Sequence, residues 1–119
     1  MAAAAAKPTT TVRERAWRYL RALHPPVATA AEIAAACVSE DGDERSALRN
    51  VRYYLRELTA AGYVREAGRE TPAYRGDRGR KRWRLVRDTG REAPLPSRRH
   101  GLVHDRNTGE SHPMGGRDG

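Results

Sequence analysis

The chain contains no phenylalanine and a single cysteine among its 119 residues, and only 38% of the residues are apolar. A chain this short and this poor in large apolar side chains can bury one small core but not two. Cys37 has no partner for a disulfide within the chain, and its place on an apolar helical face predicts a small buried residue rather than a nucleophile. No run of about 18 apolar residues occurs, so we expect no membrane-spanning helix.

The sequence also lacks the motifs of common enzyme and cofactor sites. It has no glycine-rich phosphate loop, nucleophile elbow or catalytic carboxylate pair. His100 and His104 lie in a Gly- and Pro-containing stretch without a cysteine partner, which favours a surface segment over a zinc site. Asp105 begins a stretch similar to a calcium loop, but Gly109 stands where a ligand is needed. We therefore predict no enzymatic activity, no metal and no cofactor.

The two ends of the chain are expected to lie outside the folded domain. Residues 1–9 are rich in alanine, so we predict a flexible N-terminal segment. The apolar run before Lys7 is too short for the core of a signal peptide, which favours a cytoplasmic location. Residues 89–119 hold six of the eleven glycines and three of the seven prolines. This composition predicts a Gly/Pro-rich, largely irregular C-terminal tail that adds little to stability, although Leu102 and Val103 could form one docking turn or hairpin.

Apolar periodicity and capping signals predict three helices, over residues 11–24, 30–38 and 44–61. The first two begin with capping boxes at Thr11 and Thr29, each followed three residues later by a glutamate. Asp43 fits the N-cap of the third helix, and Gly62 fits the residue just after its end. These signals place a helical region before the first predicted strand.

Two strands are expected near residues 63–67 and 82–86, joined by a long basic loop and paired antiparallel. The order of elements predicts a mostly α domain over residues 10–88 with a small β-hairpin. One core should contain the apolar side chains that face inward from these elements, namely Leu20, Leu23, Ile33, Leu48, Val51, Leu55, Leu58 and Trp83.

Positive charge is concentrated in the second half of this domain. Between Arg45 and Arg84 there are twelve Lys and Arg residues against four Asp and Glu residues, so the net charge of this stretch equals the +8 of the whole chain. Such focusing of charge on one region is typical of a surface that binds a polyanion.

The third predicted helix carries an apolar stripe and, beside it, an arginine stripe formed by Arg45, Arg49, Arg52 and Arg56. Ser46, Asn50 and Tyr53 continue the outward surface. The last three arginines have no acidic residue three or four positions away, and each like-charge neighbour costs about 0.2–0.5 kcal/mol in an isolated helix. An external anion would offset this cost, which favours nucleic-acid binding over a merely solvated basic face.

The loop near residues 68–82 supplies a second set of candidate contacts, namely Arg69, Arg75, Arg78, Arg80, Lys81 and Arg82. Gly76 and Gly79 within it allow a backbone to approach a duplex closely. Tyr74 fits either a stacking residue or an exposed loop residue without such a role.

The order of elements, together with the stretch R-N-V-R-Y-Y-L-R-E-L-T-A-A-G-Y-V from Arg49 to Val64, resembles the winged helix-turn-helix family of prokaryotic DNA-binding regulators. The resemblance covers about residues 10–88. It implies a winged helix-turn-helix fold in which the third helix enters the major groove of double-stranded DNA and the hairpin, or wing, contacts the backbone. It further implies a small transcription regulator. Many members of this family form dimers, so the resemblance allows a homodimer. Many are also encoded by phages or mobile elements.

Two other functions remain open at this point. The basic face could belong to a winged-helix protein-interaction module that docks an acidic partner, or it could bind structured RNA. Binding to DNA should depend on salt through counterion release and should favour one sequence, whereas docking of a protein partner should show neither property on DNA.

Overall fold

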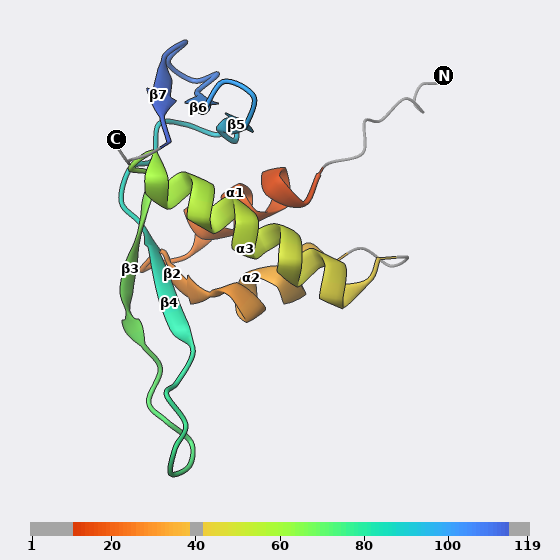
Figure 1. The fold of residues 1–119 in the computed structure, drawn as a ribbon, viewed down its shortest axis with the longest axis vertical. Coiled ribbons are helices and arrows are strands. Elements are labelled where there is room, and N and C mark those ends of the chain that lie inside the picture. The colour runs from red at the N-terminus through yellow and green to blue at the C-terminus, as the bar shows by residue number, and fades with distance from the viewer. Residues whose placement is uncertain (1–10, 39–41, 115–119) are drawn as a thin grey trace.

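The computed structural model describes residues 11–38 and 42–114, so the predicted flexible segment 1–9 and the last part of the predicted tail lie outside the described residues. Within these ranges the elements follow in the order α1 (Val12–Ala22), β2 (Val27–Thr29), α2 (Ala30–Cys37), α3 (Glu44–Ala60), β3 (Val64–Arg69), β4 (Lys81–Leu85), β5 (Leu95–Ser97), β6 (Leu102–His104) and β7 (Ser111–Pro113). Figure 1 shows their arrangement.

The fold class differs from the prediction. Three helices take up 36% of the described residues, and six strands in two antiparallel sheets take up 23%. The protein therefore has an α+β fold, and the prediction of a mostly α winged helix-turn-helix with one small hairpin is wrong. Its main error lies beyond Asp88, where a second sheet stands in place of an irregular tail.

The local signals for the helices are confirmed. Thr11 and Thr29 form complete capping boxes at the starts of α1 and α2, and Asp43 caps α3. At the end of α3, Gly62 adopts a φ of 90°, and the backbone N–H of Tyr63 donates to the carbonyl of Leu58 at 2.9 Å. This Schellman ending needs a residue without a Cβ at Gly62, and it turns the chain directly into β3.

The first sheet has the strand order β2-β4-β3, with both neighbouring pairs antiparallel. The sequence leaves room for only a very short strand after Pro26, and β2 is three residues long. The helices pack beside this sheet, and the β3–β4 hairpin extends well beyond them (Figure 1).

The predicted core is largely confirmed. Leu20, Ile33, Val51, Leu55 and Leu58 are buried, while the other three predicted core residues, Leu23, Leu48 and Trp83, are half-buried and pack against the cluster. Cys37 is buried as expected, and burial raises the pKa of its thiol to about 11. A thiol in that state is a poor nucleophile, because little thiolate forms near neutral pH.

The core contains more aromatic side chains than the sequence pattern predicts. Trp17, Tyr54 and Tyr63 are among the largest fully buried side chains. Each donates one hydrogen bond to the segment after Asp88: Trp17 Nε1 to the carbonyl of Gly90 at 2.8 Å, Tyr54 Oη to that of Pro94 at 2.7 Å, and Tyr63 Oη to Asp105 Oδ2 at 2.8 Å. The expectation that this segment adds little to stability therefore does not fit the structure.

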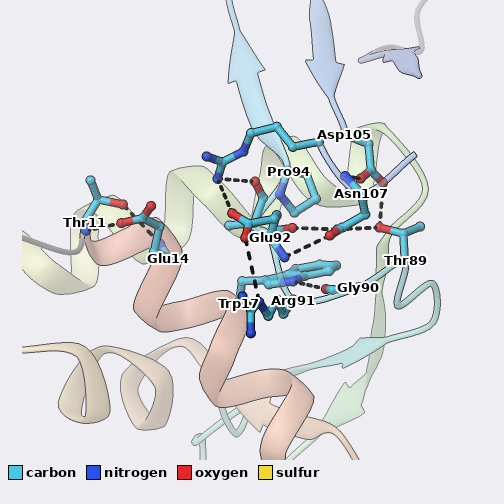
Figure 2. A network of polar contacts seen from close by, with 12 residues as sticks. Thr11, Glu14, Trp17, Thr89, Gly90, Arg91, Glu92, Pro94, Asp105 and Asn107 are labelled. Atoms are coloured by element: carbon cyan, nitrogen blue, oxygen red, sulfur yellow. Dashed lines mark hydrogen bonds and ion pairs between the residues drawn. The ribbon is translucent and has the colours of Figure 1, made fainter. Parts of the chain in front are cut away.

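The segment forms a sheet with the order β5-β6-β7, held by a polar network beside α1 (Figure 2). Asp105 is fully buried and accepts hydrogen bonds from Thr89 Oγ1 at 2.6 Å and from the backbone N–H of Asn107 at 2.8 Å, besides the bond from Tyr63. The Asn107 side chain bridges onward to Thr89 and to the backbone of Glu92. These polar contacts add to the packing of Val103 in β6, which is fully buried in the hydrophobic core as the expected docking hairpin around Leu102 and Val103 requires.

None of the helices in residues 11–38 and 42–114 combines the length and the apolar character needed to cross a membrane.

Candidate nucleic-acid interface

Helix α3 turns one side to the core and an arginine side to solvent. Val51, Leu55 and Leu58 are buried, whereas the stripe predicted beside them is exposed at each of its four positions, Arg45, Arg49, Arg52 and Arg56. The register on which the sequence analysis placed the arginines is therefore the register of the folded helix.

Within the described part of the chain, none of these four arginines forms an ion pair with a carboxylate. Arginines elsewhere do form such pairs, for example Arg21 with Asp88 at 2.8 Å. The closest partner in the stripe is aromatic, because the Arg56 guanidinium lies 5.8 Å from the centre of the Tyr53 ring. No ion pair within the described residues thus neutralises these guanidinium groups, although the Asp43 carboxylate interacts electrostatically with the stripe through Arg49.

The polar residues predicted beside the stripe have different roles. Asn50 is exposed and available to a ligand. Ser46 is half-buried, and its hydroxyl donates to Asp43 Oδ2 at 2.9 Å, so it belongs to the N-terminal cap of α3. The same bond, followed by the backbone N–H of Arg45, lowers the pKa of the exposed Asp43 carboxyl and keeps the cap ionised at neutral pH.

A hollow of about 570 Å³ separates α3 from the part of the β3–β4 hairpin where the two strands lead into the connecting loop, which we call the hairpin base. Arg52 and Arg56 line it from the helix, and three further cations, Arg69, Arg80 and Lys81, line it from the hairpin. Trp83 and Leu48 supply apolar lining between them. The structure therefore brings the two sequence-predicted basic regions to opposite walls of one concave site.

The hairpin base is held in shape by its own contacts. The Glu70 N–H donates to the carbonyl of Arg80 at 2.9 Å, and Arg69 Nη1 donates to the carbonyl of Gly79, also at 2.9 Å. Gly79 has a φ of 77°, and a Cβ there would overlap the carbonyl oxygen of Glu70. Lys81 lies 5.4 Å from the Trp83 ring centre and 3.7 Å from Glu66, which fixes the last cation of this wall.

The hairpin tip carries Arg75 and Arg78 at the far end from the helices, with Tyr74 70% exposed between the strands. Asp77 accepts hydrogen bonds from the N–H groups of Ala73 and Gly79, and these bonds lower the pKa of its carboxyl. The tip is therefore a built loop with an ionised carboxylate at its base. Its two arginines do not line the hollow beside α3.

Arg82 is not brought to the site. Alternation along β4 directs Lys81 and Trp83 toward the hollow and Arg82 toward the opposite face of the sheet. Arg84 shares that outer face and stands directly opposite Arg65 of β3. Arg82 was predicted as a contact because residues 68–82 were grouped as one basic wing, whereas β4 begins at Lys81 and its alternation separates Arg82 from Lys81.

One basic element was missed. The turn between β5 and β6 carries Arg98, whose guanidinium lies 5.0 Å from the centre of the Tyr53 ring on α3. The sequence does show three consecutive basic residues, Arg98, Arg99 and His100. They were predicted to lie in an irregular tail, and a tail has no defined position relative to α3.

Residues 11–38 and 42–114 contain no group of three or more His, Cys, Asp or Glu side chains that could hold a metal ion. The chemistry at the site is that of guanidinium and ammonium groups, which bind phosphate and, for arginine, the hydrogen-bonding edge of guanine. Comparison of the chain with family models, characterised proteins and solved structures found no match.

Proposed function

We propose that the protein binds double-stranded DNA with a sequence preference and acts as a small transcription regulator in the cytoplasm. The observation that carries the proposal is the exposed arginine stripe of α3, whose members form no ion pair with a carboxylate in the described part of the chain. An α-helix fits the major groove of B-DNA, which is about 12 Å wide.

The α3 arginines are suited to reading bases. Arg49 and Arg52 occupy the middle of the stripe, about one helical turn apart, and both are exposed. A guanidinium fork can donate two hydrogen bonds to O6 and N7 of guanine, and such a pair contributes about 1–3 kcal/mol of discrimination. Asn50, which is exposed beyond the Tyr53 edge of the stripe, has the side-chain amide that pairs with adenine.

The hairpin is suited to holding phosphates. The cations at the hairpin base face α3 across the hollow, and further arginines follow at the hairpin tip. A DNA backbone strand that borders the major groove could therefore run along the hairpin. Contacts of this kind fix the position of a protein on the duplex and carry no sequence information. They release counterions and make the affinity depend on salt.

The two roles can be separated by mutation of the full chain. Arg49→Ala or Arg52→Ala should weaken binding to the preferred duplex by about 1–3 kcal/mol and relax the choice of one or two base pairs. Arg78→Ala or Arg80→Ala should weaken binding to all duplexes about equally and lower the salt slope by about one unit per lost phosphate contact.

The measurement is a titration of wild type and variants against selected and scrambled duplexes at several salt concentrations. The same slope and the same selectivity in all four variants would contradict the assignment of roles. Salt-independent wild-type binding without preference among duplexes would overturn the proposal and favour an acidic protein partner for this face.

A further inference from the structure

The turn between β5 and β6, residues 97–101, lies against α3 and adds to its basic surface. Arg98 Nε lies 3.4 Å from Glu57 Oε2, and its guanidinium lies over the ring of Tyr53. The same ring also receives Arg56 of the stripe. Tyr53 thus joins an arginine of the helix to an arginine of the second sheet.

The turn has a fixed position relative to α3. It is closed by backbone hydrogen bonds from His100 to Ser97 at 3.2 Å and from Gly101 to Arg98 at 3.3 Å. The strand before it is tied to α3 by the bond from Tyr54 Oη to the carbonyl of Pro94. The backbone of this turn therefore needs little further ordering when one of its side chains binds an anion.

The cations of the turn are directed to solvent. The Arg98 side chain remains 68% exposed despite its contact with Glu57, and Arg99 and His100 are exposed as well. Arg99 forms no ion pair with any residue in 11–38 or 42–114. Glu57 is largely buried beneath Arg98, so it offsets only one of two adjacent guanidinium charges.

The turn and the hairpin flank the arginine stripe on opposite sides. At about 100° per residue, Leu48 projects from one edge of the stripe, and Tyr53 and Glu57 project from the other. Leu48 lines the hollow against the hairpin, whereas the other edge meets Arg98. Helix α3 therefore lies between two basic elements of independent origin in the chain.

A helix in the major groove has one phosphate strand on each side of it. We propose that the residue 97–101 turn is a second phosphate-holding element, which binds the backbone strand on the side of α3 opposite to the hairpin. The inference rests on the proposed DNA binding and adds a contact that comes from the second sheet. It gives this sheet a part in binding besides its part in the core.

The test compares two double variants of the full chain that lose equal charge. Arg98→Ala/Arg99→Ala removes the turn cations, whereas Arg18→Ala/Arg91→Ala removes two exposed arginines beside α1, next to Glu14 and Glu92. In a plot of log affinity against log salt concentration, the magnitude of the slope should decrease by about one to two units in the turn variant. It should stay near the wild-type slope in the control, and neither variant should change which duplex is preferred.

A further pair of variants separates charge from structure. Arg98→Lys keeps the positive charge and should keep the wild-type slope, while Arg99→Ala, which breaks no contact within the described residues, should lower it by up to about one unit. Thermal unfolding identifies variants that remain folded. A folded Arg99→Ala and a folded double turn variant that both bind like the α1 control would overturn the inference. A wild type without salt-dependent DNA binding would instead refute the proposed function itself.

Discussion

Replacing Asp105 with alanine should strongly destabilise the protein, because this buried carboxylate connects the second sheet to the core. It accepts hydrogen bonds from three parts of the chain: Tyr63 at the end of α3, Thr89 in the connection to the second sheet, and the Asn107 backbone in the turn after β6. With alanine in its place, the Tyr63 hydroxyl remains buried without an acceptor.

The magnitude follows from the number and type of bonds lost. A hydrogen bond to a charged group contributes about 1.5–3 kcal/mol, and a buried donor left unpaired costs about 1–3 kcal/mol. These effects overlap within one network, so we expect a loss of about 3–5 kcal/mol for Asp105→Ala. Tyr63→Phe removes one of the bonds and keeps the ring, which should cost about 1.5–3 kcal/mol.

The measurement is urea unfolding followed by tryptophan fluorescence, with Glu110→Ala as the control. Glu110 is a carboxylate of the same segment, but it is 63% exposed, and its Oε1 lies 3.9 Å from Arg87 Nη2 and 3.6 Å from His112 Nε2. An exposed pair of this kind contributes about 0–1 kcal/mol. Equal losses for Asp105→Ala and Glu110→Ala would refute the reasoning that Asp105 anchors the sheet.

The same carboxylate gives the stability a dependence on acid. Burial alone would raise the pKa of Asp105, but the hydrogen bonds from Thr89, Tyr63 and the backbone outweigh it and lower the pKa. The unfolded chain therefore takes up the proton first, and the stabilisation is lost as the pH falls below about 4 and through the lowered folded pKa. The difference in unfolding free energy between wild type and Asp105→Ala should narrow in that range, and a difference that does not change with pH would contradict an ionised anchor.

Two further variants test the core and the hairpin. Leu55→Ala should lower the free energy of unfolding by about 2–5 kcal/mol, because Leu55 is buried under the arginine stripe, and a smaller effect in a urea titration would place the stripe in another register. Gly79→Ala should disorder the hairpin base, because of its positive φ and the overlap with Glu70. We expect faster amide hydrogen exchange in Gly79→Ala, confined to β3 and β4. Exchange at the wild-type rate would show that the backbone accommodates the Cβ without loss of stability in the hairpin, which would contradict this prediction.

The helices and the arginine stripe could be predicted from the sequence because their determinants are local. A capping box spans four residues, and the position of Arg52 relative to Leu55 on a helix follows from the helical period alone. Gly62 likewise marks the end of α3 through its own backbone conformation. No long-range information was needed for these features.

The second sheet could not be predicted in this way. Its strands are three residues long and carry no apolar alternation, and they are held by polar contacts such as that between Tyr63 and Asp105, which stand 42 positions apart. The Gly- and Pro-rich composition of this segment therefore predicts irregular structure more strongly than Leu102 and Val103 predict a hairpin. The hollow and the Arg98 contact were missed for the same reason, because both depend on how distant segments dock on α3.

Whether α3 presents its arginines to a DNA duplex can be decided by a single binding measurement on the wild-type chain. Sequences bound from random duplexes are selected, and affinity for the selected and a scrambled duplex is then measured at increasing salt. The account predicts tighter binding to the selected duplex and an affinity that falls linearly with salt on logarithmic axes for both. Equal binding to both duplexes, or an affinity that does not change with salt, would contradict it.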